Sequence, residues 1–434
     1  MKRIALVVVG MVVGFAAAFG LLPAAHGAND ISTYREFNIF SEAFSKVRDN
    51  YVRPVKDSEL IDSAIQGMVS DLDPHSSYMD PKGFADFQIQ MKGEFGGVGI
   101  EVTAEDGLIK VISPIDDTPA AKAGLKSGDF IAAIDGTSIQ GIPLNDAIDK
   151  MRGPAGSKVT LTILRPGDKK TFDVALARAI IRVQTAKWHR EGDVGYIRLT
   201  EFSEQTASGL ERALRDLKHQ IGPGLKGYIL DLRNNPGGSL DQAIQVSDDF
   251  LTSGEIVSTR GRHPDDTQRY DAKPGDLTDG KKVIVLINAG TASASEIVAG
   301  ALQDHKRAEI VGMTSFGKGS VQTILPLGES GGALRLTTAR YYTPSGHSIQ
   351  AQGIIPDVAV AQGDEDETPK IARPSEADLP GHLIGEPVTK KADSSVVHAA
   401  PGKKYDDFQL SYALDLLRGQ TTVSAVTTKN AKAD

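Results

Sequence analysis

Residues 180–360 show a regular succession of strand-like and helix-like hydrophobic patterns. Apolar runs bounded by polar turns predict strands within DVGYIRLTEF, GYILDLR and KKVIVLI. Helical spacing of apolar residues follows each run, over 204–220, 239–251 and 294–304. This alternation predicts an α/β core with a largely parallel stretch of sheet. Such cores bind ligands where strands end and helices begin, so functional residues are expected at those junctions.

A β-rich module is predicted before this core, over residues 93–179. Short alternating strands are expected at GVGIEVTA, LIKVISPI, DFIAAIDG and KVTLTILR, with helices near 120–123 and 144–151. The opening FGGVGIEV places three glycines before the first strand, where backbone N–H groups can turn inward and converge on an anion. Taken alone, this glycine-rich segment is more typical of an ordinary turn in a small β-domain.

The longer segment SPIDDTPAAKAGLKSGDFIAAIDGTSI resembles a PDZ domain of the bacterial protease type over nearly its whole length. The resemblance implies that the module captures the C-terminus of a peptide and that pockets select an apolar tail. The strand after the glycine-rich loop would pair with the peptide backbone. The carboxylate would be cradled by the loop residues Gly97, Val98, Gly99 and Ile100.

The segment 28–92 is predicted to be helical. Phe37, Phe40 and Phe44 recur three or four residues apart and therefore lie on one helix face. That apolar face needs a cover, and a second copy of the chain or another part of the same chain would serve equally well. A second helix follows, until the prolines of LDPHSSYMD end the pattern. His75, in that segment, is predicted to belong to a hydrogen-bonded turn and not to act as a base or metal ligand.

The two ends of the chain differ from its body. Two basic residues precede an apolar run over 4–22, which predicts a signal peptide over 1–27 that is either removed or retained as a membrane anchor. In both cases the rest of the chain is expected to be exported to the periplasm, because the basic residues stay on the cytoplasmic side. Charge and proline predict a disordered linker over 361–403, and helical spacing predicts a C-terminal helix and tail over 404–434.

Composition restricts the chemistry further. A chain of 434 residues, 40% hydrophobic and 24% charged, is long and apolar enough to fold two or three domains. Its net charge of −8, without a concentration of lysine and arginine, argues against a nucleic-acid partner. The absence of cysteine excludes a thiol nucleophile, disulfides and cysteine-ligated metals. No metal site and no cofactor are predicted.

The junction NAGTASASEI offers a candidate nucleophile, Ser293, on the tight turn before a helix. The first N–H groups of a helix lack intrahelical partners, so an oxyanion formed beside Ser293 would find the N–H of Ala294. The loop DLRNNPGGSLDQA lies at another junction, where Gly237 or Gly238 would supply a second donor. On the local pattern alone, a helix cap at Ser293 and a plain strand-ending loop at the glycines are the commoner structures.

Lys318 is the candidate general base. It lies between two glycines in FGKGSVQT, and no acid adjoins it. A lysine acts as a base only when its pKa falls from about 10.4 toward neutrality, and desolvation is the usual cause. In an extended chain Gln322 would lie on the same face and could hold the neutral amine without adding a charge. A solvent-exposed loop lysine would fit the same residues.

Several separate motifs, taken together, resemble the carboxyl-terminal processing (tail-specific) serine peptidases over residues 35–360: TASASEI, DLRNNPGG, FGKGSVQT, LDPHSSYM and the PDZ block. The resemblance implies Ser293 as nucleophile, Lys318 as general base and Gln322 as the residue that orients the base. It also implies the oxyanion donors named above and a Clp-protease or crotonase-like α/β core. The capping role at the helix would then fall to Thr291 or Ser295.

These features predict an exported serine endopeptidase that recognises apolar protein C-termini through its PDZ domain and cleaves with a Ser293/Lys318 dyad. Its expected partners are proteins or peptides with exposed apolar C-termini. Membrane association and assembly into a homodimer or higher oligomer stay open. Two other functions fit parts of the pattern: a PDZ scaffold that binds C-termini without cutting them, and a crotonase-type acyl-CoA enzyme, which export disfavours because acyl-CoA is a cytosolic substrate.

Overall fold

The computed structural model describes residues 27–434 except 106, 169, 329–330, 363–373, 387–394, 421–424 and 430–434. The apolar run over 4–22, predicted as signal or anchor, lies outside the described residues. No helix in the described part of the chain is both long enough and apolar enough to cross a membrane. The chain divides into two compact units, Met1–Met68 and Val69–Asp434.

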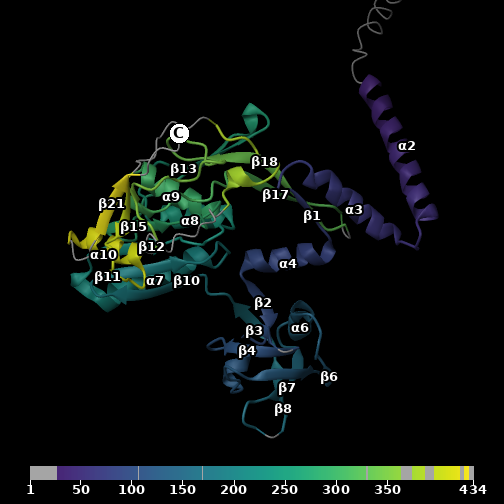
Figure 1. Ribbon diagram of the computed structural model, residues 1–434, viewed down its shortest axis with the longest axis horizontal. Coiled ribbons are helices and arrows are strands. Elements are labelled where there is room, and N and C mark those ends of the chain that lie inside the picture. Colours follow the sequence, from purple (N-terminus) through teal and green to yellow (C-terminus); the bar gives the residue numbers. More distant parts are fainter. Residues whose placement is uncertain are drawn as a thin grey trace, which may run out of the picture. The chain divides into compact units, whose positions relative to one another are not determined.

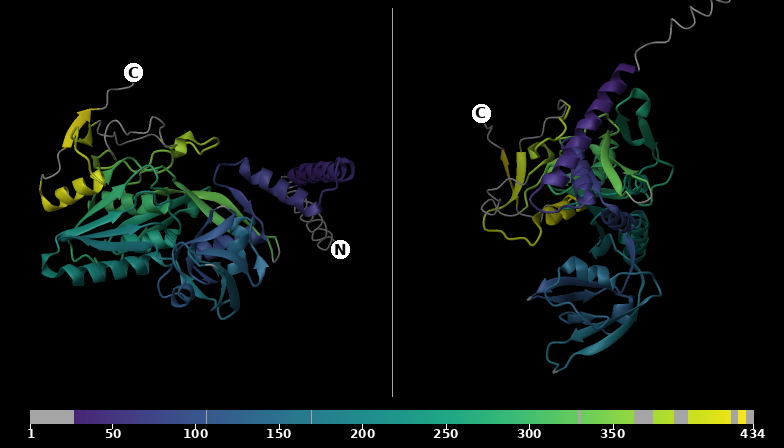
Figure 2. Two further views of the ribbon diagram at one scale, coloured as in Figure 1. Left: turned by 60° about the horizontal axis from the view of Figure 1, so that its bottom comes forward. Right: turned by 90° about the vertical axis from the view of Figure 1, so that its right-hand side faces the viewer.

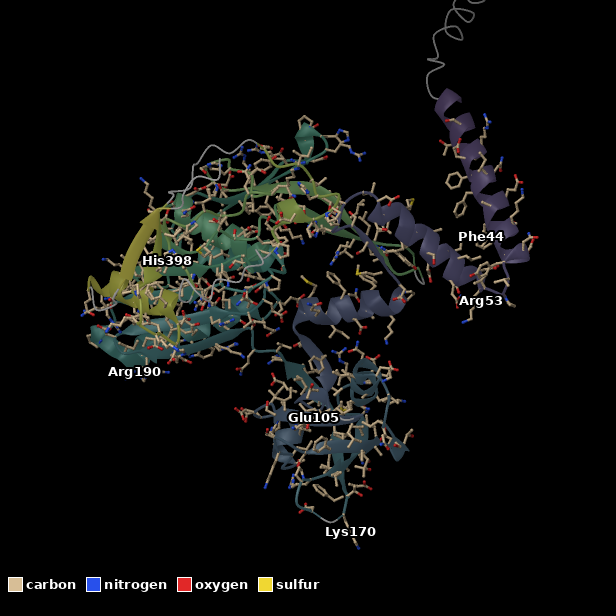
Figure 3. All side chains as sticks on the ribbon, in the orientation of Figure 1. Phe44, Arg53, Glu105, Lys170, Arg190 and His398 are labelled. Atoms are coloured by element: carbon tan, nitrogen blue, oxygen red, sulfur yellow. The ribbon has the colours of Figure 1, made fainter. Side chains whose placement is uncertain are left out.

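The described part of the first unit is helical, as its spacing of apolar residues predicts. It contains α2 (Gly27–Asn50) and most of α3 (Asp57–Ser70). The phenylalanine stripe lies on α2, where Phe37 and Phe40 are exposed while Phe44, labelled in Figure 3, is half-buried with the guanidinium of Arg48 5.9 Å from its ring centre. The stripe is therefore left largely open to solvent in the single chain.

The β-rich module of the second unit is a small sheet around its own apolar core (blue in Figure 1). A separate pair of strands, β2 (Glu94–Gly97) and β9 (Ala179–Arg182), brings the two ends of the module side by side. Two helices, α5 (Pro119–Lys122) and α6 (Leu144–Met151), contribute buried residues to the core. The sheet runs in the order β3 (Ile100–Glu105), β4 (Leu108–Pro114), β5 (Phe130–Ile134), β7 (Lys158–Leu164) and β8 (Phe172–Ala177), with β6 (Thr137–Ser138) paired to β5.

The remaining chain builds an α/β core on a six-stranded sheet, in agreement with the alternating pattern. The order is β10 (Ala186–Glu191), β11 (Val194–Leu199), β12 (Gly227–Asp231), β15 (Lys282–Ile287), β16 (Ala308–Gly312) and β19 (Val358–Ala359). Only β10 is antiparallel to its neighbour, and the other adjacent pairs are parallel. The carboxyl ends of β12 and β15 consequently meet at one edge of the sheet.

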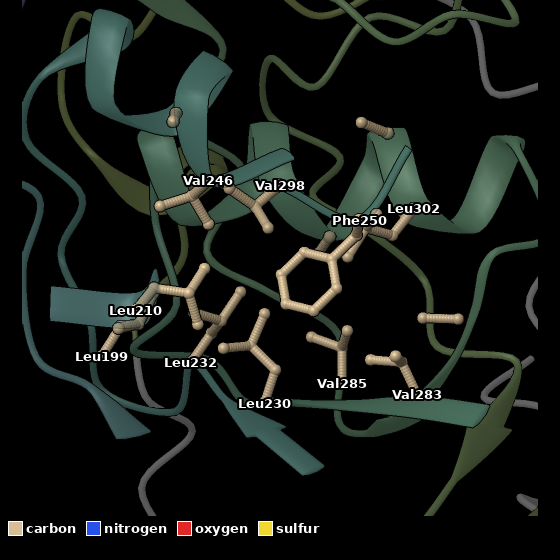
Figure 4. Packing of buried hydrophobic residues seen from close by; sticks show 14 of the residues in the cluster. Leu199, Leu210, Leu230, Leu232, Val246, Phe250, Val283, Val285, Val298 and Leu302 are labelled. Carbon is tan, nitrogen blue, oxygen red and sulfur yellow. The ribbon is translucent and has the colours of Figure 1, made fainter. Parts of the chain in front are cut away.

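Helices cover both faces of this sheet because its strands bear apolar side chains on both sides. One face packs on α7 (Thr206–Ile221), α8 (Leu240–Asp248) and α9 (Ala294–Asp304). Figure 4 shows Leu230 and Val285 of the sheet facing Val298 of α9 and the neighbouring Phe250. The other face packs on α10 (Phe408–Arg418), which Figure 2 (left, yellow) shows across the strands from α7 (teal).

A second, antiparallel sheet was not foreseen from the sequence. Its order is β1 (Ser77–Met79), β18 (Ala333–Tyr342), β13 (Glu255–Gly261) and β14 (Gln268–Asp271), with β17 (Ser320–Pro326) also paired to β18. Short 3-10 turns occur at Gly222–Gly224, Pro264–Asp266 and Glu376–Asp378. The small α4 (Pro81–Lys92) follows β1, capped by Asp80, whose carboxylate accepts the N–H of Gly83.

The range predicted as a disordered linker, 361–403, is ordered in the parts that the structure describes, and the prediction is wrong for those parts. Glu376 is fully buried, and Ser395–Ala399 forms β20, which pairs with β21 (Ala425–Lys429). Residues 363–373 and 387–394 lie outside the described ranges. Around Glu376 the prediction failed because polar side-chain hydrogen bonds attach the segment to the core, and such contacts leave no hydrophobic period in the sequence. At β20 it failed because the apolar residues that pack on the core form only a short run.

Candidate active site

The candidate nucleophile and the candidate oxyanion loop lie at adjacent strand ends. Backbone and side-chain hydrogen bonds join the two loops: the N–H of Ala292 donates to the carbonyl of Asn235 at 3.0 Å. The hydroxyl of Thr291 donates to the carbonyl of Leu232 at 2.8 Å, and that of Ser295 to the carbonyl of Asn235 at 3.1 Å. These hydroxyls therefore hold the loops together and do not cap the helix, contrary to the expectation for Thr291 and Ser295.

Ser293 is the residue at which the chain turns into α9. Its backbone has φ 55° and ψ −116°, a conformation that side-chain-bearing residues rarely adopt, and it is 7% exposed. Strain of this kind costs on the order of 1–3 kcal/mol and is typically retained at functional sites. The turn presents Ser293 to a cleft, whose lining it joins.

Two backbone donors flank Ser293. The N–H of Ala294, at the first helical position, makes no hydrogen bond within the described chain. The N–H of Gly237 donates to Oδ1 of Asn235 at 2.9 Å, whereas no described residue accepts from the N–H of Gly238. A Cβ at Gly237 would lie 2.7 Å from the carbonyl oxygen of Ala292 and 2.9 Å from Cβ of Ser293, so only glycine allows this approach.

Lys318 reaches the same cleft from the loop before β17. One buried carboxylate, that of Glu296 on α9, joins this loop to the nucleophile turn. Its Oε2 accepts the N–H of Ser293 at 2.7 Å and the N–H of Lys318 at 2.9 Å. Its Oε1 accepts the N–H of Gly317 at 2.7 Å and the hydroxyl of Ser315 at 2.5 Å. Burial raises the pKa of Glu296 to about 7, although these four donors act in the opposite direction.

The environment of Lys318 shifts its protonation equilibrium toward the neutral form. Burial, assisted by the nearby positive charge of Arg335, lowers the pKa of Lys318 to about 8. The carboxylates of Glu376, Glu296 and Asp73 act against this shift. A pKa near 8 leaves a substantial fraction of the amine unprotonated near neutral pH, which is the state that a general base requires.

Gln322 lines the cleft beside Lys318, from β17. Its amide nitrogen donates to the hydroxyl of Ser320 at 3.0 Å and to that of Thr337 at 3.2 Å. Within the described residues its side-chain oxygen accepts no hydrogen bond, and neither Gln322 nor another residue hydrogen-bonds the amine of Lys318. The oxygen of Gln322 is therefore the part of the amide left for an interaction in the cleft.

The cleft itself has a volume of about 910 Å³. It brings together five of the residues singled out from the sequence: Ser293, Lys318, Gln322, Gly237 and Gly238. Apolar side chains make up much of the remaining wall: Phe87, Met91, Leu240, Val321, Tyr270 and Tyr341. The wall also includes polar residues, among them Asp241, Asp265 and Asp266, so a cleft of this size and lining accommodates a peptide segment with apolar or polar side chains.

The loop predicted to bind a carboxylate borders a second, smaller pocket of about 200 Å³ in the β-rich module. Gly97, Val98, Gly99 and Ile100 all line it, together with the apolar Met151. Gly99 has φ 80°, and a Cβ there would overlap the side chain of Thr118, so the loop conformation depends on glycine. The N–H groups of Val98 and Gly99 have no acceptor among the described residues.

Sequence reasoning missed the side chains that support the base. The N–H of Gly319 donates to Oε1 of Gln350 at 3.1 Å, and the amide of Gln350 donates to Glu376 at 2.9 Å. Nε2 of His75 lies 2.8 Å from the same carboxylate, which places His75 in a hydrogen-bonded turn beside the base loop. The only signal in the sequence for these supporting residues was the motif LDPHSSYM, which contains His75 and had no assigned role.

Comparisons with known proteins identify three regions of the chain. Residues 193–360 match peptidase family S41, residues 96–176 match the PDZ domain, and residues 23–83 match the N-terminal domain of the activating protease CtpB. The carboxy-terminal-processing protease of Bartonella bacilliformis is 56% identical over 399 residues, which is 92% of each chain. The carboxy-terminal processing protease CtpB of Bacillus subtilis is 39% identical over 330 residues, 74% of this chain and 67% of that protein. Among solved structures, a photosystem II D1 C-terminal processing protease is 31% identical, covers 74% of this chain and 92% of its own, and has a TM-score of 0.43.

Proposed function

Because the chain belongs to peptidase family S41, as a carboxy-terminal processing serine peptidase with a PDZ domain, we propose that it cleaves exported proteins that end in apolar residues, with Ser293 and Lys318 as its catalytic dyad. The observation that carries this proposal is the shared cleft, where Ser293 on a strained turn and Lys318 with a lowered pKa lie together. Peptidase membership leaves no support for a scaffold that binds without cutting or for an acyl-CoA enzyme.

The proposed reaction begins with neutral Lys318. Its amine takes the proton of the Ser293 hydroxyl as the serine oxygen attacks the peptide carbonyl. The lysine then gives this proton to the amine of the leaving peptide. In the second half of the reaction the amine of Lys318 deprotonates a water molecule, which hydrolyses the acyl-enzyme, and the proton returns to the oxygen of Ser293. Gln322 would orient the amine of Lys318 through its side-chain oxygen, which the hydrogen bonds of its nitrogen leave free.

The oxyanion would be held by the N–H groups of Ala294 and Gly238. Gly237 is the less suitable of the two adjacent glycines because its N–H already donates to Asn235. It contributes by allowing its loop to approach Ser293. One such donor is worth about 10²–10³ in turnover in serine proteases.

Substrate selection is assigned to the PDZ domain. The free N–H groups of Val98 and Gly99 support capture of a C-terminal carboxylate, and the apolar lining of the same pocket supports an apolar last residue. Holding the tail restricts which chains enter the cleft and raises the local concentration of the scissile segment.

Export rests on the N-terminal sequence, where two basic residues precede the apolar run over 4–22. We propose that the run either is removed or anchors the enzyme at the inner membrane, with the catalytic body in the periplasm. Fractionation of cells that produce the full chain, with protease protection of intact spheroplasts, tests this. Recovery of the protein in the cytosol with its first residues intact would refute export.

The proposed function is tested by mass spectrometry of proteins from cells with the active enzyme or with Ser293→Ala. Proteins with apolar tails should gain trimmed or internally cleaved products only when the active enzyme is present. In a purified assay, a peptide with a free apolar C-terminus should be cleaved faster than the same peptide amidated at that end. Unchanged turnover in Ser293→Ala would exclude Ser293 as nucleophile, and equal cleavage of both peptides would exclude carboxylate recognition.

A further inference from the structure

The side chain of Gln322 is oriented from the neighbouring strand. β17 and β18 are antiparallel, and Gln322 lies directly opposite Thr337 after a bulge between Val321 and Gln322. The amide nitrogen of Gln322 donates to the hydroxyl of Thr337 at 3.2 Å. Thr337, on the neighbouring strand, therefore contacts the side-chain amide of Gln322, which in the proposed mechanism orients the amine of Lys318.

The direction of this hydrogen bond is set by a third residue. The hydroxyl of Thr337 donates its single hydrogen to Oδ1 of Asp73 at 3.1 Å. A carboxylate can only accept hydrogen bonds, so this hydroxyl cannot also donate to Gln322 and must accept from it. The nitrogen of the Gln322 amide is thereby fixed on the side of Thr337, and its oxygen is left for the cleft.

Asp73 is well suited to hold this direction. It is 6% exposed and accepts the N–H groups of His75 and Ser76 at 2.8 and 3.0 Å and the hydroxyl of Ser76 at 2.7 Å. Burial alone would raise the pKa of Asp73, but these hydrogen bonds and the one from Thr337 outweigh it and lower the pKa. The hydroxyl of Ser76 in turn accepts the N–H of Thr337 at 3.1 Å, which binds the turn to β18.

We propose that Thr337 is a positioning residue for catalysis: its hydroxyl, held by Asp73, fixes the amide of Gln322 with the oxygen available to the amine of Lys318. This inference rests on the proposed roles of Ser293 and Lys318. It gives the LDPHSSYM motif a function, because Asp73 and Ser76 belong to it. Thr337 acts only through Gln322 and touches neither the substrate nor the reacting atoms.

The experiment is a double-mutant cycle on the full-length enzyme with a peptide substrate that has a free apolar C-terminus. Thr337→Val removes the hydroxyl at nearly constant shape and should lower kcat about tenfold, less than the roughly 10²–10⁴-fold contribution of a general base because only the orientation of Lys318 is affected, with KM little changed. Thr337→Ser keeps the hydroxyl and should restore most of the rate. In a Gln322→Ala background, Thr337→Val should cause no further loss, because the two residues act as one unit.

A matched control comes from the PDZ sheet, where the hydroxyl of Thr162 donates to Asp173 on the adjacent strand at 2.7 Å. Thr162→Val removes a hydrogen bond of the same kind away from the cleft and should leave kcat unchanged. If Thr337→Val does not fold, Thr337→Ala serves instead, since it also removes the hydroxyl that accepts from Gln322; it should also lower kcat only when Gln322 is present.

The outcomes separate this inference from the proposed function. If Ser293→Ala or Lys318→Ala retains full turnover, the proposed function itself is wrong. If Ser293→Ala and Lys318→Ala are both inactive but Thr337→Val lowers kcat by the same factor with or without Gln322→Ala, Thr337 does not act through Gln322. The inference about Thr337 is then wrong while the proposed function stands. The inference is equally wrong if Thr337→Val has normal kcat, or if Thr337→Ser is as impaired as Thr337→Val.

Discussion

The lowered pKa of Lys318 leads to a quantitative prediction for the pH dependence of cleavage. The reaction needs the neutral amine, so kcat/KM should fall as pH decreases below the pKa of Lys318 in the free enzyme. With a pKa of about 8, about one molecule in eleven carries the neutral amine at pH 7. An ordinary lysine with a pKa of 10.5 would be neutral in about one molecule in three thousand at that pH. The lowered pKa, due to desolvation and to the charge of Arg335, therefore increases the reactive fraction on the order of 300-fold.

The assay is kcat/KM for a fluorogenic peptide with a free apolar C-terminus, measured from pH 6 to pH 10. The rate should rise nearly tenfold from pH 6 to pH 7, bend near pH 8 and reach a plateau above pH 9. The C-terminal carboxylate of the substrate is ionised throughout this range and does not contribute to the slope. A rate that is flat from pH 6 to pH 8, or one that still rises tenfold from pH 9 to pH 10, would refute a desolvated Lys318 as the base.

Two charge variants test whether the fall in rate at low pH follows the pKa of Lys318, because the charges of Glu376 and Arg335 act on that pKa whereas burial and hydrogen bonds set the pKa of Glu296. Glu296 has a pKa of about 7 and titrates in the same range, and coupled groups show the pKa values of the pair. Glu376→Gln removes a carboxylate that raises the pKa of Lys318 and should move the fall in rate to lower pH. Arg335→Met removes a cation that lowers this pKa and should move the fall in rate to higher pH. Asp276→Asn, at a partly buried ion pair with Arg307 whose residues do not line the cleft, should leave the pH dependence in place. Shifts in the same direction for both cleft variants would contradict the assignment.

Three further variants test other parts of the structure. Glu296→Gln replaces one carboxylate oxygen, which accepts two hydrogen bonds, by an amide nitrogen that cannot accept them. It should lower the free energy of unfolding in urea by about 2–6 kcal/mol, and a decrease below about 1 kcal/mol would contradict these hydrogen bonds. Gly99→Ala adds a Cβ against Thr118 at φ 80° and should raise KM for tailed peptides about tenfold with little change in kcat, whereas an unchanged KM would exclude this loop from tail binding. Asp407→Ala removes a partner of the buried Arg233, at 2.6 Å, and should destabilise the fold by about 1–3 kcal/mol, less than the roughly 3–5 kcal/mol for a fully buried pair because Asp231 still pairs with Arg233; urea unfolding with an unchanged midpoint would show that α10 does not need this pair.

The α/β core and the position of Ser293 were predictable because both depend on local patterns. The buried strand β15 is a continuous apolar run, and α9 begins at the residue where helical spacing begins. The pairing of β17 with β18 was not predictable in the same way, since both strands are only partly buried and lack a clean alternation. As a result, the contacts of Gln322 with Thr337, and of Thr337 with Asp73, could not be inferred from residues so far apart in the chain.

The supporting residues of the site share a physical reason for being missed. Glu296 reads as an ordinary acidic residue in the first turn of a helix, where a carboxylate suits the helix dipole. Its actual function is set by tertiary structure: one carboxylate oxygen accepts the N–H groups of both Ser293 and Lys318. The separation between nucleophile and base is thereby fixed through backbone groups, which carry no residue identity. The sequence can indicate that Ser293 and Lys318 react. The role of Glu296 in fixing the distance between them can be recognised only from the structure, which shows the N–H groups that its carboxylate accepts.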